Sequence, residues 1–129
     1  MRLHPPIPVL RIFDAALAKR FYVDWLGFTI DWEHRFGPDF PLYVQISRDA
    51  VVLHLTEHYG DCSPGAKVFV NVDDVEALHR ELSERPNPNM RPGVEVAPWN
   101  AKVMDVTDPF GNRLSFNQPL PMQGNAPKR

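Results

Sequence analysis

The clearest structural signal lies in residues 101–117, which read AKVMDVTDPFGNRLSFN. Two runs that favour extended structure, Ala101 to Thr107 and Arg113 to Asn117, flank a segment rich in Asp, Pro, Gly and Asn. These residue types favour turns, because proline presets φ, glycine accepts positive φ, and Asp and Asn side chains bond to nearby backbone. The stretch therefore predicts a β-hairpin closed by Asp108-Pro109-Phe110-Gly111-Asn112.

A strand, a helix and a further strand are predicted on the N-terminal side of this hairpin. Lys67 to Val72 has a valine at every second position, which is typical of a strand with one apolar face. Asp73-Asp74 can cap a helix that ends near Arg85-Pro86, and Val94 to Ala97 follows as a short strand. The apolar stripe of this helix would consist of Val75, Leu78 and Leu82. The order is thus βαβββ.

The first half of the chain shows the same order. Pro8 to Phe13 reads as a strand, and Asp14 is a good N-cap for a helix over Ala15 to Leu26, with Gly27 at its C-terminal end. We expect its apolar face to carry Leu17, Phe21 and Trp25, with Ala18 and Tyr22 beside them. Three strand-like runs follow, Phe28 to Phe36, Leu42 to Ser47 and Val51 to Glu57.

Two βαβββ modules, at about residues 8–58 and 66–118, predict one α+β domain over residues 1–129. We expect a curved, cup-shaped mixed or antiparallel sheet with the helices on its outer face and a mobile tail at 119–129. The uncovered face would form a concave pocket, so function is expected there.

Composition excludes several classes of function. The formal net charge is −2 with scattered Lys and Arg, which gives no basic stripe for nucleic acid. No apolar run approaches the roughly 18 residues of a membrane span, so no membrane association is expected. The single cysteine, Cys62, cannot form an internal disulfide, and residues 1–6 lack the apolar core of a signal peptide. We therefore expect a cytoplasmic protein.

Three phrases resemble the glyoxalase/bleomycin-resistance/dioxygenase superfamily, also called the vicinal-oxygen-chelate superfamily. They are Phe21-Tyr22-Val23-Asp24-Trp25-Leu26-Gly27-Phe28, Val52-Leu53-His54-Leu55, and residues 106–116, VTDPFGNRLSF. The Asp-Pro-x-Gly-Asn turn alone is a weak signal, but its place in the last hairpin of a second βαβββ module makes the resemblance specific. With Val72-Asp73-Asp74-Val75, the resemblance covers about Pro8 to Gln118.

Enzymes of this superfamily hold a divalent metal with His, Gln and Glu ligands. The resemblance places the four ligand positions near Ile7 or Pro8, at His54, at Lys67 and at Ser115. Only His54 is a competent ligand, whereas a catalytic divalent site normally has about three protein ligands. We therefore expect no metal, no other cofactor and no catalytic residue.

The bleomycin-resistance branch resembles the chain better, because it keeps the fold and the Leu-His strand without the metal set. This resemblance implies a homodimer that sequesters a small molecule, such as a bleomycin-type antibiotic, in pockets shared by two subunits. Aromatic residues would stack on planar groups and acidic residues would meet cationic ones. The candidate ligand-binding residues are His54, Trp32, Phe40, Tyr43, Trp99 and Glu33, and Asp31 is a further acidic residue that could supply a pocket wall.

Other interpretations remain open at this point. A metal-dependent lyase, isomerase or dioxygenase with a rearranged site would need His54 and two ligands from the set His58, Glu57, Asp61, Glu33 and His34. A structural or regulatory dimer with a vestigial pocket would bind no small molecule. In that case His54 would be a half-buried histidine satisfied by Thr56 or a neighbouring strand, and Trp32 and Trp99 would fill the core or a dimer seam.

Overall fold

The structure, a computed structural model, describes residues 1–85, 87 and 90–121. It divides into two compact units. Unit 1 comprises Met1–Val68 together with Thr107–Arg113, and unit 2 comprises Phe69–Val106 and the residues from Leu114 on. The turn predicted at residues 108–112 thus belongs to unit 1, whereas most of the two strands that it joins belongs to unit 2.

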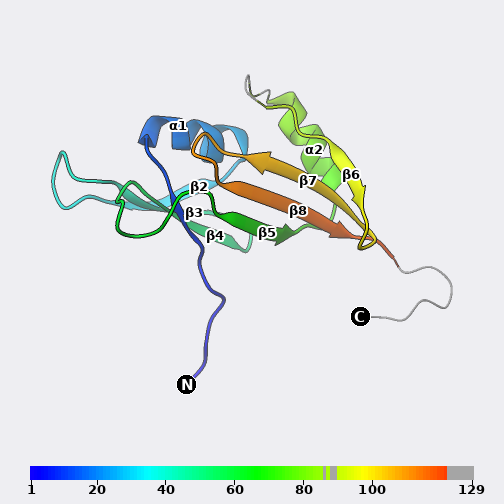
Figure 1. The fold of residues 1–129 in the computed structure, drawn as a ribbon, viewed down its shortest axis with the longest axis horizontal. Helices are drawn as coiled ribbons and strands as arrows, with labels where there is room; N and C mark the ends of the chain where they lie inside the picture. Colours follow the sequence, from blue (N-terminus) through cyan, green and yellow to red (C-terminus); the bar gives the residue numbers. More distant parts are fainter. Residues whose placement is uncertain (86, 88–89, 122–129) are drawn as a thin grey trace. The chain divides into compact units, whose positions relative to one another are not determined.

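Unit 1 contains the first predicted βαβββ module (Figure 1). Its elements are β1 (Val9–Arg11), α1 (Ala15–Lys19), η1 (Arg20–Trp25), β2 (Thr29–His34), β3 (Tyr43–Arg48) and β4 (Val51–Thr56). The sheet order is β1-β4-β3-β2. Strand β1 pairs with β4 in parallel, whereas β3 pairs antiparallel with both β2 and β4. The mixed sheet predicted from the sequence is confirmed.

The first helix differs from the sequence prediction in its winding. It begins as expected with Asp14, whose side chain accepts a hydrogen bond from the Leu17 backbone N–H. From Arg20 on it widens into a π-helix, in which Leu26 N donates to Phe21 O. Gly27 follows at a φ of 80°, the left-handed value expected of a helix-ending glycine.

The buried side chains of this helix agree with the predicted apolar face except at one position. The expected stripe included Leu17, and this was wrong, because Leu17 is 39% exposed. The buried side chains of the helix are Ala18, Phe21, Tyr22 and Trp25.

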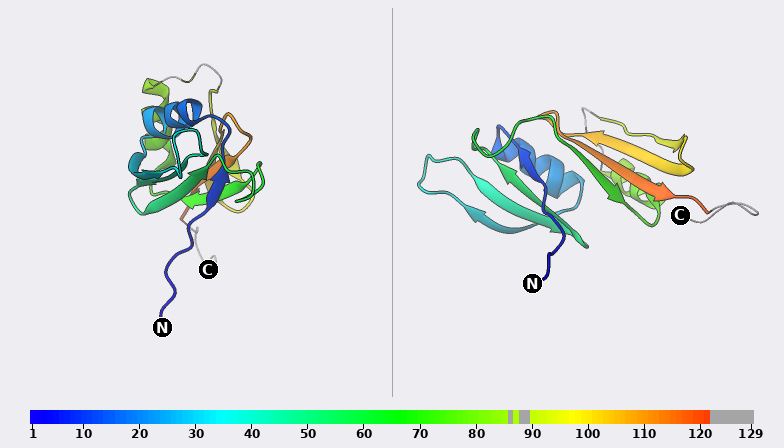
Figure 2. Two further views of the ribbon diagram at one scale, coloured as in Figure 1. Left: turned by 90° about the vertical axis from the view of Figure 1, so that its left-hand side faces the viewer. Right: turned by 60° about the horizontal axis from the view of Figure 1, so that its bottom comes forward.

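The helix covers one face of the first sheet, as Figure 2 shows. Side chains of the helix and of that face line a common cavity, among them Ala18 and Tyr22 from the helix and Ile46 and Leu55 from the sheet. All four of these residues are buried. The hydrophobic core of unit 1 therefore lies between the helix and the sheet, and the opposite sheet face carries no helix of this unit.

The turn at residues 108–112 belongs to this core. The carboxylate of Asp108 accepts hydrogen bonds from the Tyr22 hydroxyl at 2.7 Å and from the Phe110 N, Asn112 N and Asn112 Nδ2 atoms at 2.8 Å each. Asp108 is only 4% exposed and Tyr22 is fully buried. Gly111 has a φ of 90°, which only glycine adopts at little cost. The predicted turn is confirmed, and one carboxylate organises it.

Unit 2 contains most of the second module. Its elements are β5 (Lys67–Asn71), α2 (Val75–Glu84), β6 (Val94–Ala97), β7 (Ala101–Thr107) and β8 (Arg113–Pro119), in the sheet order β5-β8-β7-β6. This order repeats that of the first sheet, so the prediction of two βαβββ modules is confirmed. Helix α2 contacts its own sheet through the Glu76–Lys102 ion pair and through Gln118, which accepts from Val75 N.

The C-terminal end of the second sheet extends further than predicted. Strand β8 continues to Pro119, and Leu120 N then donates to Asn100 O at 3.0 Å. The expected tail at 119–129 therefore cannot begin before residue 121, and its part from 122 on lies outside the described residues. Across the described ranges, no helix has the length and apolar character needed to traverse a membrane.

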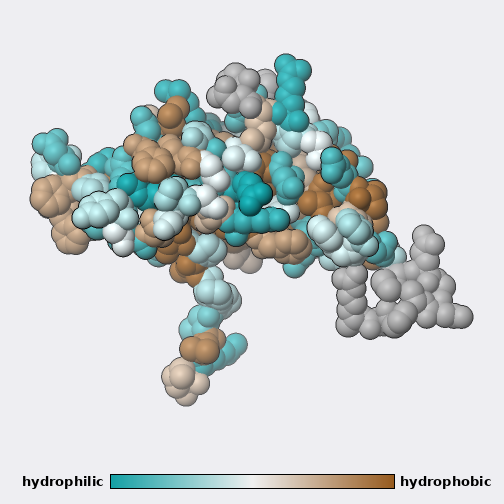
Figure 3. All heavy atoms as spheres, viewed as in Figure 1, coloured by the Kyte–Doolittle hydropathy of each residue, from teal (hydrophilic) through white to brown (hydrophobic). Residues whose placement is uncertain are grey.

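Large hydrophobic side chains also reach the surface. On unit 1 the exposed ones include Phe13, Trp32, Phe36, Phe40 and Tyr59. Hydrophobic and hydrophilic residues are interspersed over the face drawn in Figure 3. Single exposed apolar residues are common in proteins, so only an arrangement with specific chemistry indicates a site.

Candidate ligand-binding site

The site is built on the uncovered face of the first sheet. Successive side chains of a strand point to opposite faces. In β3 the residues Val44 and Ile46 are buried against the helix, so Tyr43, Gln45 and Ser47 point the other way. In β4 the same alternation buries Leu53 and Leu55 and turns His54 to the uncovered face. The register pairs Gln45 with His54 directly.

Both ring nitrogens of His54 have protein partners. The Tyr43 hydroxyl lies 2.7 Å from Nδ1, and Oε1 of Gln45 lies 3.0 Å from Nε2. Burial lowers the pKa of His54, since desolvation disfavours the charged imidazolium. Burial also raises the pKa of Tyr43, with smaller contributions from Asp61 and Cys62. The pair is thus held in its neutral form at pH near 7.

Trp32 completes an aromatic surface beside His54. Its ring is nearly parallel to that of Tyr43, with centroids 6.0 Å apart and an interplanar angle of 8°. It meets the His54 ring at 5.3 Å and 69°, close to edge-on. Trp32 is 43% exposed, so part of its surface remains open to solvent. Such an exposed aromatic surface can stack on a planar ligand.

A β-bulge brings Asp31 to the same face. The register between β2 and β3 shifts between Ile30 and Trp32, which leaves Asp31 as the extra residue. Its carboxylate accepts from Gln45 Nε2 at 3.0 Å and from Ser47 Oγ at 2.9 Å. We call this set of six side chains the open-face cluster: Asp31, Trp32, Tyr43, Gln45, Ser47 and His54.

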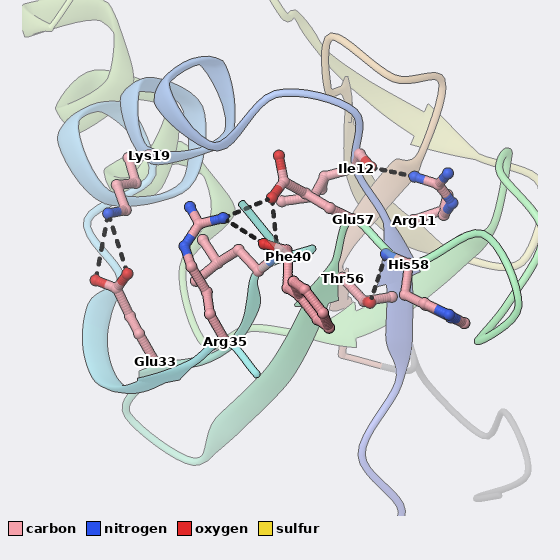
Figure 4. A network of polar contacts seen from close by, with 10 residues as sticks. Arg11, Ile12, Lys19, Glu33, Arg35, Phe40, Thr56, Glu57 and His58 are labelled. Atoms are coloured by element: carbon pink, nitrogen blue, oxygen red, sulfur yellow. Dashed lines mark hydrogen bonds and ion pairs between the residues drawn. The ribbon is translucent and has the colours of Figure 1, made fainter. Parts of the chain in front are cut away.

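Two of the predicted ligand-binding residues lie elsewhere in unit 1. Glu33 pairs in register with Val44, on the helix side of the sheet, and Lys19 reaches from the helix to its carboxylate at 3.2 Å (Figure 4). Phe40 lies in the loop between β2 and β3, where Arg35 donates to its carbonyl oxygen at 2.8 Å. Its side chain is 54% exposed. Only His54, Trp32 and Tyr43 of the predicted set are brought together here.

The remaining predicted residue, Trp99, lies in unit 2. It occupies the turn between β6 and β7 and is 49% exposed. Its indole Nε1 donates to Asn117 Oδ1 at 2.8 Å, and Asn117 Nδ2 donates in turn to Asn71 Oδ1 at 3.0 Å. Trp99 is therefore held by an amide network of its own unit.

The residues needed for a rearranged metal site have other partners. Glu57 accepts from Leu42 N at 2.8 Å and pairs with Arg35 at 3.5 Å (Figure 4). Asp61 accepts from the Thr56 hydroxyl at 2.6 Å and lies 3.4 Å from His58. Within residues 1–85, 87 and 90–121, no group of three His, Cys, Asp or Glu side chains could hold an ion.

The four positions at which the superfamily's enzymes hold a metal can be matched between the two modules, because equivalent hydrogen bonds align one module with the other. Ile12 N donates to Thr56 O in the first module, and Val72 N donates to Asn117 O in the second. Counting back two residues from each acceptor makes His54 and Ser115 equivalent. Counting back five from each donor makes Ile7 equivalent to Lys67. An isoleucine, a lysine and a serine are poor partners for a divalent cation, so the donor set does not fit a metal.

Sequence reasoning missed Gln45 and Ser47 as members of the site. A signal was present, because residues 43, 45 and 47 must share one face of any strand that spans them. The sequence offers Asp31 as an acidic wall of the pocket, but its contacts with Gln45 and Ser47 depend on the bulge, which no glycine or proline beside residue 31 marks.

Comparison with known proteins gives one family. A family model described as "Glyoxalase superfamily protein" matches residues 2–122. No curated protein matches the chain.

Solved structures share the fold along their whole length. A bleomycin-binding protein complexed with bleomycin is 20% identical, with a TM-score of 0.72, over 92% of this chain and 100% of that one. TnmS3, an antibiotic-binding protein from Streptomyces sp. CB03234, is 24% identical with a TM-score of 0.65, over 93% and 100%. The bleomycin-binding protein from bleomycin-producing Streptomyces verticillus, complexed with copper(II)-bleomycin, is 26% identical with a TM-score of 0.63, over 90% and 96%.

Proposed function

Because the chain belongs to the glyoxalase superfamily, we propose that it binds a small organic molecule of the antibiotic type without a metal of its own, and that it does so as a cytoplasmic homodimer. The observation that carries the proposal is the open-face cluster, in which an exposed Trp32 lies beside a His54 whose two nitrogens are already bonded to protein. A histidine with both nitrogens bonded to protein is poorly suited to metal ligation, since a ligating nitrogen needs a free lone pair, and the exposed ring of Trp32 is the part of the cluster that a ligand can reach.

Binding of a bleomycin-type molecule is consistent with the chemistry of this face. The rings of Trp32 and Tyr43 offer stacking surfaces, and Asp31 supplies a negative charge beside them. Two solved structures with the same fold are bleomycin-binding proteins in complex with bleomycin or copper(II)-bleomycin, which supports this ligand as the first to test. Sequestration alone would protect a cell, because a bound antibiotic cannot reach its target.

The test combines metal analysis with ligand binding. Protein purified without chelator is analysed for bound metal, and its thermal unfolding is then followed with metal-free bleomycin. A ligand at about 100 times its Kd should stabilise the protein by about 2.7 kcal/mol. We expect Trp32→Ala to abolish most of this shift and the matched control Phe36→Ala, an exposed aromatic on the same hairpin, to retain it. Stoichiometric metal that His54→Ala removes would refute the proposal.

The dimer is tested separately by light scattering during gel filtration, with and without bleomycin. A mass near twice 14.8 kDa is expected. A monomer at all concentrations would refute that part of the proposal and leave ligand binding to be judged by the thermal shift.

A further inference from the structure

We propose that Asp31 fixes the direction of every hydrogen bond in the open-face cluster, so that the site offers the lone pairs of the Tyr43 oxygen and selects ligands that carry an N–H donor or a cation. This inference deepens the proposed function and rests on it, because it names the chemistry of the ligand for the same site.

The direction starts at Asp31. An ionised carboxylate only accepts hydrogen bonds, so the Ser47 hydroxyl and the Gln45 amide nitrogen must both donate to it, at 2.9 and 3.0 Å. In the opposite orientation the Gln45 amide oxygen would face the Asp31 carboxylate, and two hydrogen-bond acceptors would then lie in contact without a proton between them. Asp31 therefore turns the Gln45 oxygen toward His54.

The amide then selects the tautomer of His54. Oε1 of Gln45 can only accept, so the imidazole proton must lie on Nε2, 3.0 Å away. Burial lowers the pKa of His54, which keeps the ring neutral at pH near 7. Nδ1 is then left with a lone pair directed at Tyr43.

The chain of bonds ends at Tyr43. Its hydroxyl proton is donated to His54 Nδ1 at 2.7 Å, so its oxygen is left as an acceptor. Charges around it favour the same kind of ligand, because Asp31 and Asp61 are acidic and Asp61 already acts on Tyr43. Arg11, the cation of strand β1, donates to the Ile12 carbonyl (Figure 4) and lies 4.4 Å from the centre of the Phe13 ring.

The ligand predicted from these bonds is a planar group with an amidinium, guanidinium, ammonium or amide N–H at its edge. Its plane would stack against Trp32 and its donor would reach the Tyr43 oxygen. A carboxylate or phosphate would face acceptors at the same place and should bind weakly.

The tautomer is tested without any ligand. Protein with ¹⁵N-labelled histidine is studied by NMR at neutral pH, and the His54 signals are assigned from a His54→Gln variant. We expect wild-type Nε2 to appear protonated and Nδ1 unprotonated. In Asp31→Leu and Asp31→Asn both signals should move toward those of mixed tautomers, whereas the exposed control Asp39→Asn should leave them unchanged. A protonated Nδ1 in wild type, or unchanged signals in both Asp31 variants, would overturn the inference.

Selectivity is tested with two planar probes of similar size, benzamidine and benzoate. Their affinities are measured from NMR shifts at Tyr43 and His54. Benzamidine should bind wild type at least about tenfold more tightly than benzoate, and Tyr43→Phe should remove on the order of tenfold of its affinity. Tyr59→Phe, which removes an exposed hydroxyl elsewhere, should change neither. Equal binding of the two probes, absence of benzamidine binding, or an undiminished affinity in Tyr43→Phe would overturn the inference.

The result also separates this inference from the function it rests on. If bleomycin binds wild type and Tyr43→Phe equally well, and benzamidine is not preferred, the inference is wrong and the proposed function survives. If benzamidine is selected through Tyr43 while bleomycin has no effect, the inference holds and the antibiotic assignment is wrong.

Discussion

Removing one oxygen atom, in Tyr22→Phe, should measurably destabilise the protein. The Tyr22 hydroxyl donates to the buried Asp108 carboxylate at 2.7 Å, and burial, with the charge of Asp108, raises the pKa of Tyr22 well above its usual value. Hydrogen bonds to charged groups contribute about 1.5–3 kcal/mol. The ring itself stays packed, with Phe21 at 4.9 Å and Phe28 at 6.3 Å between ring centroids. We therefore expect the free energy of unfolding to fall by about 1.5–3 kcal/mol, the contribution of the bond alone.

The assay is equilibrium urea unfolding followed by circular dichroism and by tryptophan fluorescence. Tyr59→Phe is the matched control, because that hydroxyl is exposed, and it should change stability by less than about 0.5 kcal/mol. In a double-mutant cycle with Asp108→Asn, the double variant should lose less stability than the sum of the two single losses, by about 1 kcal/mol or more, since both substitutions remove the same charged hydrogen bond. A Tyr22→Phe variant as stable as Tyr59→Phe, or strict additivity, would refute the reasoning.

Three further outcomes are expected. Gly111→Ala should lower the free energy of unfolding by about 1–3 kcal/mol through its positive φ alone, because nothing lies within 4 Å of the added Cβ. Gly93→Ala adds a Cβ to equally open space without a positive φ, so it should not destabilise the protein. Urea unfolding measures both variants. Lys19→Ala should cost less than about 1 kcal/mol, and the loss should shrink at high salt, since its ion pair with Glu33 is exposed; unfolding at two salt concentrations checks this. Because the folded-state pKa of His54 is lowered, the contribution of its neutral ring to stability is complete above about pH 6.5 and is lost as pH falls through the lower folded value. The free energy of unfolding should therefore change less steeply with pH below about 6.5 in His54→Gln than in wild type. An unchanged slope in the variant would contradict this prediction.

The fold was predictable because the residues that begin and end its helices and form its turns act locally. Asp14, Gly27 and the turn from Asp108 to Asn112 each act within a few residues, and each is found where the sequence predicts it. The π-helical turn was not predictable in this way. The spacing of the apolar residues suits an ordinary helix and already indicates that Tyr22 lies on its apolar face, but only packing on the sheet decides that Leu17 stays partly exposed.

The candidate site was predictable only in part, for a related reason. Strand alternation placed His54 opposite Leu53 and Leu55, and the structure agrees. The same rule sets Trp32 and Glu33 on opposite faces, and only their side-chain types favoured grouping both as pocket walls. The bulge that joins Asp31 to Trp32 depends on pairing between β2 and β3, which no single strand encodes.

The turn at residues 107–113 has a consequence for how the protein is made. It belongs to unit 1, although residues 69–106, which precede it, belong to unit 2. Tyr22 and Asp108 are 86 positions apart, so in a growing chain the Tyr22 hydroxyl lacks this partner until residue 108 has left the ribosome. Domains usually complete their structure from the N-terminus during synthesis. Here the N-terminal unit cannot complete its structure until the turn at residues 107–113 has been made. A fragment that stops before Thr107 should therefore lack Asp108, the hydrogen-bond partner of Tyr22 on the first helix.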